Sequence, residues 1–415
     1  MEEKSLTKEI LHVDLNNFYA SVEMILNPSL KDKFVAVCGS VENRHGIILA
    51  KSENAKKLGV KTGMVIRDAL KLCPSLVLVE AKHNKYIAYS KLVKNIYRKY
   101  TDYIESFGID ECWLDVTHSI KMFGSAEKIA NEIREEVKRE LGLTVSVGVS
   151  FNKVFAKLGS DIKKPDAVTV ISLDNFKQKI WNLPVEDLLF VGRSMRLKLN
   201  KININTIGDL ANTDCAYLTK KFGKWGKVLY DYANGLDSEP VNKDNERDEI
   251  KSVGNSMTTY RDLVTDEDIK IIFTVLAESV SARVIDHNLG KPKTLSIYVR
   301  DEFLESITRQ RKFEHPTVLP EDFVSTAFNL YKDNVKRGTI VRSLGISVSD
   351  FVCGEEQISF DDEKYDKKNK LNDTVTSIRS KYGGESVLKG ILLKDKKFMR
   401  ENSKEGHFLN IDDDI

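Results

Sequence analysis

Three carboxylates stand out because each lies at the end of a short apolar stretch. Asp14 closes the segment ILHVD, in which Leu11 and Val13 alternate with polar residues at the two-residue period of a strand. Asp110 and Glu111 lie in GIDE, between two short apolar runs, which predicts a tight hairpin. Because adjacent strand residues face opposite ways, both acids can reach one site only if the turn twists them.

Such a set of carboxylates could bind divalent cations. Carboxylates at strand ends supply the oxygen ligands that Mg²⁺ prefers and leave room for substrate phosphates. Two such ions suit in-line phosphoryl transfer, with one at the attacking oxygen and the other at the leaving oxygen. The alternative is that Asp14 is an ordinary turn residue and the hairpin a solvated turn.

The residues after Asp14, LNNFYASVE, predict a helix start beside the first carboxylate. Either Asn16 or Asn17 can cap this helix. The first amides of a helix have no partner within it, so those of Asn17, Phe18 and Tyr19 could face a metal-bound phosphate.

The surrounding segments predict a split βαββαβ unit. Helices are expected over 85–100 and 126–141, where apolar residues recur at helical spacing, and a strand over 144–150, where valines alternate. An antiparallel sheet with two helices on one face would then carry the three carboxylates. The intervening segment, about 27–84, reads as an insertion.

Composition excludes some classes of protein. The 415 residues include 41% hydrophobic and 30% charged residues, an ordinary globular balance, and the formal net charge of +2 does not by itself indicate a nucleic-acid partner. No apolar run reaches the length of a membrane span, so no membrane association is predicted. The five cysteines form no CxxC pair, which predicts reduced thiols in a cytoplasmic protein.

Three segments together resemble a known family. HVDLNNFYASVE, SFGIDECWLDVT and VSVGVSFNKVFAKLGSDIKKP are similar to the signature blocks of Y-family, lesion-bypass DNA polymerases, of the bacterial DNA polymerase IV and UmuC type. The resemblance implies an α+β right-hand fold with a ferredoxin-like palm, small fingers, a helical thumb and a little-finger domain. It places the palm at 1–26 and 85–174, the fingers at 27–84, the thumb at 175–242, a linker at 243–250, the little finger at 251–352 and a tail at 353–415.

The family's chemistry implies roles for residues of the palm. Asp14, Asp110 and Glu111, with the backbone carbonyl of Leu15, would hold two Mg²⁺ ions. Tyr19 aligns with the aromatic residue that packs under the incoming sugar and excludes a 2′-hydroxyl, although a buried helix aromatic is the alternative.

The predicted triphosphate site departs from the family pattern. Lys164, just before a proline, is implied to contact the phosphates, and Asn17 and Phe18 lie beside them. In the insertion, Lys51 and Lys56 are candidates, and a solvated helix face is the alternative. Many family members carry a Tyr-x-x-Arg pair where this chain has Glu53 and Lys56. Lysine keeps the charge of arginine but loses its bidentate geometry.

Contacts to DNA are expected in two further regions. In VEDLLFVGRSMRLKLNKININTIGDLA, which predicts a helix–hairpin–helix, Gly192 would let backbone amides approach a phosphate and Arg193 adds charge. Trp225, nearby, is predicted to be core. In the four predicted strands of 251–350, the candidate phosphate contacts are Lys251, Arg300 and Arg309.

The tail carries one candidate interaction motif. Gln357, Ile358 and Phe360 resemble a shortened form of the peptide with which bacterial lesion-bypass polymerases dock on the sliding clamp. Equally, the two apolar side chains could pack the tail onto the preceding domain. A short helix ending at Gly383 and a strand over 385–393 are predicted after them.

The sequence therefore predicts a template-directed DNA polymerase specialised for damaged templates. Its partners would be primer-template DNA, dNTPs and, if the tail motif holds, the sliding clamp. The protein would be a monomer in the bacterial cytoplasm, associated with the nucleoid. One alternative is a catalytically reduced DNA-binding accessory protein of the same fold. Another is a nucleotidyl cyclase, which accounts for the carboxylates but not for the second DNA-binding region.

Overall fold

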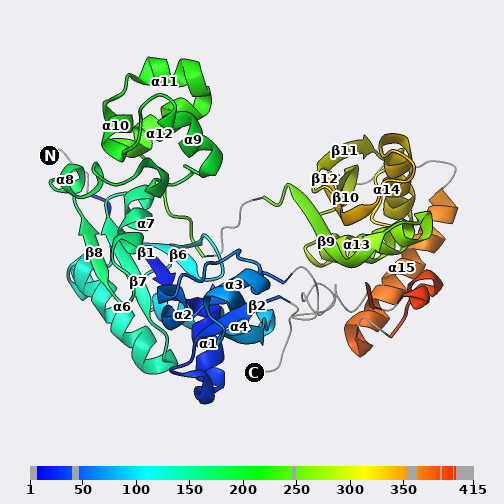
Figure 1. Ribbon diagram of the computed structural model, residues 1–415, viewed down its shortest axis with the longest axis horizontal. Helices are drawn as coiled ribbons and strands as arrows, with labels where there is room; N and C mark the ends of the chain where they lie inside the picture. Colours follow the sequence, from blue (N-terminus) through cyan, green and yellow to red (C-terminus); the bar gives the residue numbers. More distant parts are fainter. Residues whose placement is uncertain are drawn as a thin grey trace. The chain divides into compact units, whose positions relative to one another are not determined.

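The computed structural model divides into two compact units. It describes residues 7–39, 46–244, 249–352, 362–383, 386–395 and 397–398. The first unit holds the described residues up to 244, and the second holds those from 249 on (Figure 1). In the described part of the chain, no helix is long and apolar enough to cross a membrane.

The centre of the first unit is a five-stranded sheet with the order β5-β6-β1-β7-β8. Its strands are β1 Ile10–Leu15, β5 Ile104–Ser106, β6 Glu111–Asp115, β7 Val145–Ser150 and β8 Val168–Ile171. Neighbours are antiparallel except β7 and β8, which run parallel. The predicted hairpin and strand pairing are thus confirmed, and β8 is an additional strand.

Strand β1 is buried on both faces. Alternate residues Leu11, Val13 and Leu15 pack into a core formed with α1 Phe18–Leu26, α4 His83–Tyr97 and α6 Ala126–Leu141. Helices α4 and α6 are the two predicted helices. The residues in between face the opposite side, where Ile10 packs with Ala156 of α7, Lys153–Ile162. A short helix, α5 Ile120–Phe123, precedes α6.

The predicted insertion forms a small layer of its own. Its strands pair in the order β3-β2-β4, with a separate core. The elements are the 3-10 turn η1 Pro28–Leu30, β2 Val35–Cys38, β3 Ile48–Lys51, α2 Glu53–Lys57, α3 Ile66–Leu72 and β4 Val77–Glu80. Helix α2 begins at its cap Ser52, whose hydroxyl accepts a hydrogen bond from the amide of Ala55.

A helical segment follows β8. It consists of α8 Phe176–Ile180, η2 Val185–Asp187, α9 Arg193–Asn200, α10 Ile207–Asn212, α11 Cys215–Phe222 and α12 Lys224–Ala233. The predicted hairpin around Gly192 lies between η2 and α9. The prediction that Trp225 is core is wrong, because its side chain is 48% exposed and contacts the ring of the exposed Phe190 instead. Phe190 has φ +68°, a conformation that favours glycine.

The beginning of the predicted tether is held on the first unit. The amide of Asn242 donates to Glu105 Oε2 at 3.0 Å, and Asp244 forms an ion pair with Arg98 at 2.6 Å. Glu105 Oε1 in turn accepts from the buried Lys153 at 2.7 Å. The chain is thus fixed as far as residue 244.

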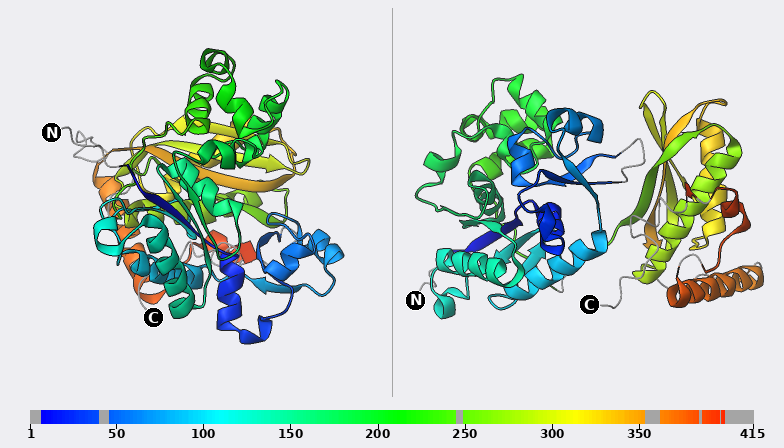
Figure 2. Two further views of the ribbon diagram at one scale, coloured as in Figure 1. Left: turned by 90° about the vertical axis from the view of Figure 1, so that its left-hand side faces the viewer. Right: turned by 60° about the horizontal axis from the view of Figure 1, so that its bottom comes forward.

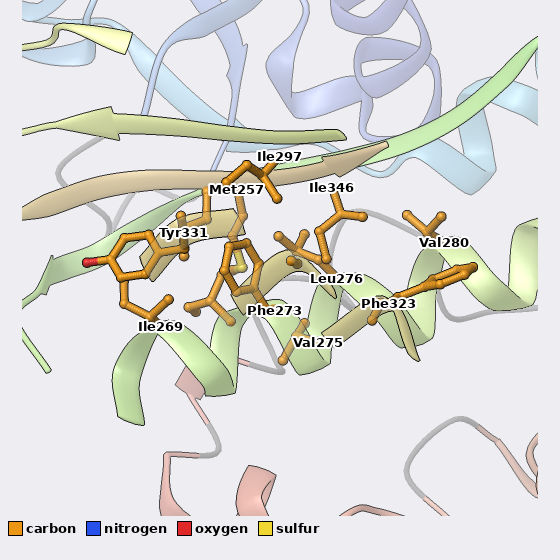
Figure 3. Packing of buried hydrophobic residues seen from close by; sticks show 14 of the residues in the cluster. Met257, Ile269, Phe273, Val275, Leu276, Val280, Ile297, Phe323, Tyr331 and Ile346 are labelled. Atoms are coloured by element: carbon orange, nitrogen blue, oxygen red, sulfur yellow. The ribbon is translucent and has the colours of Figure 1, made fainter. Parts of the chain in front are cut away.

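The second unit is a four-stranded antiparallel sheet covered by helices on one face (Figure 2). The strand order is β11-β10-β12-β9. The elements are β9 Ser252–Leu263, α13 Asp266–Asp286, β10 Lys291–Asp301, β11 Ser306–Lys312, α14 Pro320–Asn334 and β12 Val341–Val352. The predicted strands are confirmed. Figure 3 shows Phe273 of α13 and Ile346 of β12 in the core between the helices and the sheet.

The C-terminal residues pack on α13. Helix α15 Asp362–Tyr382 stops just before Gly383, as predicted, but its 21 residues make it longer than the short helix expected. Its Arg379 lies 3.2 Å from Glu278, a carboxylate only 2% exposed. Removing Arg379 while Glu278 stays buried would take a partner from that carboxylate, a change that commonly costs about 3–5 kcal/mol. The predicted strand over 385–393 is wrong. The 3-10 turn η3 Gly390–Lys394 lies there, and its Leu392 is buried in the core instead of pairing with a strand.

Candidate active site

Asp14 and Glu111 face each other across the centre of the first sheet. They are direct partners in the β1–β6 register, which places both side chains on the face that α7 covers. The hairpin turn is fixed to the end of β1, because the amide of Leu15 donates to the Asp110 carbonyl at 3.0 Å. Ser90 of α4 donates to the Ile109 carbonyl and holds the turn from the other side.

Helix α7 lies unusually close to the sheet. A Cβ placed on Gly148 of β7 would lie 1.9 Å from the Ala156 carbonyl oxygen and 2.5 Å from the amide of Ser160. Only glycine permits this approach, since it lacks a side chain. Three polar side chains that begin on or just after α7, those of Lys157, Ser160 and Lys164, therefore reach the carboxylate face.

Two lysines neutralise two of the carboxylates. Lys164 Nζ lies 2.8 Å from Asp14 Oδ2 and 2.7 Å from Asp161, and Lys157 Nζ lies 2.6 Å from Glu111 Oε2. Lys164, which was predicted to contact the triphosphate, lies beside the first carboxylate in this structure. The sequence did not predict the Lys157–Glu111 pair. It depends on the glycine contact between α7 and β7.

The three carboxylates have different proton affinities. Burial raises the pKa of Asp14 against the opposing effect of Lys164. Burial also raises the pKa of Asp110, and the neighbouring charge of Glu111 adds to the shift. Although burial raises the pKa of Glu111 too, contacts with His12 and Lys157 lower it overall.

These pKa shifts indicate whether the three carboxylates suit a bound cation. Burial disfavours the ionised forms of Asp14 and Asp110, and a bound cation would stabilise them. The donor atoms are oxygens, as hard divalent cations require. Within the described residues, no three His, Cys, Asp or Glu side chains gather closely enough to hold a metal ion. Asp14 and Glu111 each contact a lysine in this structure.

Tyr19 lies in an aromatic stack next to the carboxylates. Its ring lies parallel to that of Tyr86 with centroids 4.2 Å apart, and His83 packs edge-on against it at 5.8 Å. Tyr86 is held in turn by Glu23, whose buried carboxylate accepts its hydroxyl at 2.8 Å. The orientation of the Tyr19 ring is thus set by residues of α1 and α4. Phe18 is buried in the core.

The residues that depart from the family pattern contact one another. Glu53 Oε2 lies 3.7 Å from Lys56 Nζ and accepts from the side-chain amide of Asn17 at 3.3 Å. Asn17 is the N-terminal cap residue of α1, has φ +50° and makes no side-chain cap hydrogen bond. Asn16 is buried and bonded to Ser146. The expected cap by either asparagine side chain is therefore wrong.

The candidate for DNA contact at the start of α9 and the candidate for triphosphate contact in the small sheet differ in character. Gly192 and Arg193 are exposed at the start of α9, whose Gly192 cap offers no side chain. Lys51, in the small sheet, is bonded to Thr62 Oγ1 at 3.0 Å. Burial, followed by the charge of Lys56, lowers the pKa of Lys51.

The uncovered face of the second sheet is lined with small polar residues. The register brings Thr258, Ser343 and Arg300 side by side on β9, β12 and β10, opposite to the apolar face. The same face carries Ser252, Gly254, Ser256, Gly345, Ser347, Ser349, Ser296, Tyr298, Thr308, Gln310 and Lys312. Arg309 pairs with Ile297 in the register and so lies on the helix side, where it donates to Asn334 of α14.

Two of the predicted groups need separate mention. Lys251 is exposed at the start of the second sheet. Gln357, Ile358 and Phe360 lie outside the described residues.

Fold and site together define a right-hand nucleic-acid polymerase: a carboxylate-bearing sheet, a small layer beside it, a helical segment and a separate sheet with an open polar face. Comparisons with family models agree. Residues 13–161 match the impB/mucB/samB family and 250–360 its C-terminal domain, and 186–237 match the thumb domain of DNA polymerase iota.

Similar proteins and structures are known along most of the chain. A DNA polymerase IV from Acetivibrio thermocellus is 50% identical over 95% of this chain and 100% of its own length, and one from Clostridium kluyveri is 38% identical over 94% and 99%. A solved chimera of the Y-family polymerases Dbh and Dpo4 has a TM-score of 0.73 at 26% identity, covering 83% of this chain and all of the chimera. A ternary complex of Dbh polymerase has a TM-score of 0.59 at 27% identity over 83% and 100% of the two chains.

The chain belongs to the Y-family of DNA polymerases. It is accordingly a DNA-directed DNA polymerase of the translesion class, and the predicted fold class is confirmed. The accessory-protein alternative is not favoured, because all three carboxylates are present in the expected hairpin and strand.

Proposed function

We propose that this polymerase joins dNTPs to a primer 3′ end at the carboxylates of Asp14, Asp110 and Glu111, with the Leu15 carbonyl as a further ligand, and that two Mg²⁺ ions are its cofactor. The pairing of Asp14 with Glu111 across β1 and β6, with Asp110 fixed beside them, carries this proposal. When bound, the ions would lower the barrier to attack by the primer hydroxyl and neutralise the leaving pyrophosphate.

The chain's own residues would bind and orient the substrates. Lys164 and Lys157 pair with carboxylates here, and each would turn to bind the triphosphate. Lys51 and Lys56 would bind the triphosphate from the small layer. Glu53 takes the place of the usual tyrosine, and its contact with Asn17 would fix the small layer against α1. The carboxylate sheet would be the palm, the small layer the fingers, the helical segment the thumb and the second unit the little finger.

A primer-extension assay tests the proposed chemistry. The full chain should extend a primed template with dNTPs and Mg²⁺, and should stop when EDTA is added. It should also insert opposite an abasic or bulky lesion. Synthesis that is unchanged by EDTA would contradict the metal assignment.

We further propose that the open face of the second sheet follows the DNA backbone. Small hydroxyl-bearing side chains and Arg300 allow close approach to phosphates without reading bases. The location of Arg309 on the helix side makes it a weaker candidate than Arg300, and Lys312 a better one. In the first unit, the start of α9 with Gly192 and Arg193 would contact the backbone.

Removing residues 251–415 should weaken primer-template binding strongly. Fewer phosphates would be neutralised, so the logarithm of affinity should fall less steeply with the logarithm of salt concentration. Fluorescence anisotropy over a salt series measures both quantities. Because the second unit has its own core, the first unit should keep its fold, which circular dichroism checks. Equal affinity and equal salt slope in both proteins would refute the assignment.

A sliding clamp remains a proposed partner. If 357–360 docks in an apolar pocket of the clamp, changing both Gln357→Ala and Phe360→Ala should remove clamp-stimulated synthesis and spare synthesis on bare primer-template. Matched changes at the exposed Leu371 of α15 serve as a control. If stimulation persists in the double variant, the segment is not the clamp contact.

DNA as substrate would place the protein at the bacterial nucleoid.

A further inference from the structure

Two aromatic side chains of the helical segment are exposed and contact each other. Phe190 lies in the turn between η2 and α9, and Trp225 lies in the first turn of α12 (Figure 1). Phe190 is 52% exposed and Trp225 48%, and their ring centroids lie 5.5 Å apart at an interplanar angle of 62°. The proposed chemistry uses neither ring. Scattered apolar residues are normal on a protein surface, whereas two large rings in contact form an exposed apolar patch.

The backbone holds Phe190 outward in an unfavourable conformation. The amide of Val191 donates to the Leu188 carbonyl at 3.0 Å, so residues 188–191 form a turn with Phe190 as its third residue. Phe190 has φ +68°, where glycine or asparagine is usual and a bulky side chain is an outlier. Leu188 and Val191 are buried in the core of the helical segment and fix the turn on both sides. Strained residues that the surrounding structure keeps in place cluster at functional sites.

Trp225 has an unused hydrogen-bond donor. The indole N–H groups of Trp113 and Trp181 donate to backbone carbonyls at 2.9 and 3.3 Å. The indole N–H of Trp225 finds no acceptor in the part of the chain that the structure describes. A ring with an apolar body and a free N–H suits an interface where a polar acceptor adjoins an apolar surface.

The charges around the two rings favour an anionic partner. Together η2, α9 and α12 carry five cationic and three anionic side chains. Two of the acids are paired with cations of the same elements. The remaining charges are those of Asp187 on one side and of Arg193, Lys198 and Lys224 on the other. This excess of positive charge favours the DNA backbone over a basic protein surface, and it continues the proposed DNA contact at the start of α9.

We propose that Phe190 and Trp225 make an apolar contact with the duplex part of the primer-template, packing on the deoxyribose next to the phosphate that the start of α9 binds. The inference rests on the proposed DNA contact of Gly192 and Arg193. The carbon–hydrogen face of a deoxyribose is the apolar part of the backbone and adjoins a phosphate, so one short surface can bind both. The contact requires no particular base, and the indole N–H of Trp225 can donate to a phosphate oxygen.

Phe190→Asn separates this apolar contact from the electrostatic one. Asparagine tolerates the positive φ of this position, so the turn should be kept and the melting temperature should not fall. Loss of the half-exposed ring should weaken binding of primer-template by the full chain about fivefold. Because no phosphate contact is removed, the slope of log affinity against log salt concentration should not change. Fluorescence anisotropy over a salt series measures both quantities.

Two control variants accompany Phe190→Asn. Arg193→Gln removes one phosphate contact, so it should reduce the salt slope by about 0.9. Met122→Asn on α5 removes an apolar side chain that is 81% exposed outside the helical segment, and it should change neither affinity nor slope.

Three outcomes would overturn the proposal. The first is an affinity of Phe190→Asn equal to that of the unaltered chain. The second is a loss that appears with single-stranded DNA but not with a blunt duplex, which would mean stacking on bases. The third is self-association of the unaltered chain that Phe190→Asn removes without changing DNA affinity, because the patch would then bind a second copy. Sedimentation velocity detects this last case.

A measurement on the unaltered chain avoids any effect of substitution on folding. Trp113 is only 4% exposed and Trp181 is partly buried, so acrylamide should quench chiefly the fluorescence of Trp225. Primer-template should protect Trp225 and lower the quenching constant, and the decrease should disappear in Trp225→Phe. A quenching constant that is equal with and without primer-template contradicts the proposal.

Failure of this inference is distinct from failure of the proposed function. If Arg193→Gln reduces the salt slope while Phe190→Asn binds normally, the start of α9 contacts DNA and the two rings do not. If Arg193→Gln changes neither affinity nor slope, the proposed DNA contact at α9 is itself wrong.

Discussion

Asp110→Ala should reduce primer extension by at least about a thousandfold while leaving primer-template affinity within a few-fold. The reason is that phosphoryl transfer depends on positioning and on neutralising charge, and Asp110 would supply part of the negative field that holds the cations. Rapid-quench single-nucleotide insertion measures the rate, and fluorescence anisotropy measures DNA binding. Near-normal extension would rule out Asp110 as a ligand.

Asp110 is a cleaner test than Glu111. Removing Glu111 would leave Lys157, whose side chain is only 16% exposed, without its partner and could lower stability as well as activity. Asp68→Ala on α3 is a suitable control, because this carboxylate is half exposed and pairs with the neighbouring surface cations Arg67 and Lys71. Its insertion rate should be unchanged.

Tyr19→Ala should lower the preference for dNTPs over ribonucleotides by about 100-fold, with a much smaller loss of dNTP insertion. The Tyr19 ring is held against Tyr86, so it would present a fixed wall to a 2′-hydroxyl. Steady-state insertion of matched dNTP and ribonucleotide pairs gives the ratio.

Tyr19→Phe is the matched control for this prediction. It keeps the ring and the stack on Tyr86, and so should keep the discrimination. If Tyr19→Ala discriminates as well as the unaltered chain, the exclusion arises elsewhere. The buried Phe18 would then be the next residue to test.

Local patterns were sufficient to predict the elements that carry the carboxylates. The alternation around Asp14 and the turn before Glu111 predicted β1 and β6, and the structure pairs these two residues directly. The second sheet was also predictable, because its strands alternate clearly. By contrast, the face on which Arg309 lies depends on the register with β10, which a strand pattern alone does not define.

The rest depended on contacts between distant residues. The pairing of Lys157 with Glu111 follows from the close approach of α7 to Gly148, and nothing local indicates it. The prediction of a strand over 385–393 failed because apolar periodicity cannot distinguish a strand from a turn that packs against a helix. Trp225 likewise contacts a residue distant in the sequence, the exposed Phe190, which its own helix pattern does not indicate.

The contact between Gly148 and α7 also determines how the two lysines can leave the carboxylates that they neutralise. The Ala156 carbonyl lies where a side chain on Gly148 would be, so the helix cannot move closer to the sheet, and moving away would open the packed core. Lys157 and Lys164 must therefore leave their carboxylates by side-chain rotation over a stationary backbone. Exchange of lysine for substrate would then need no conformational gate in the palm.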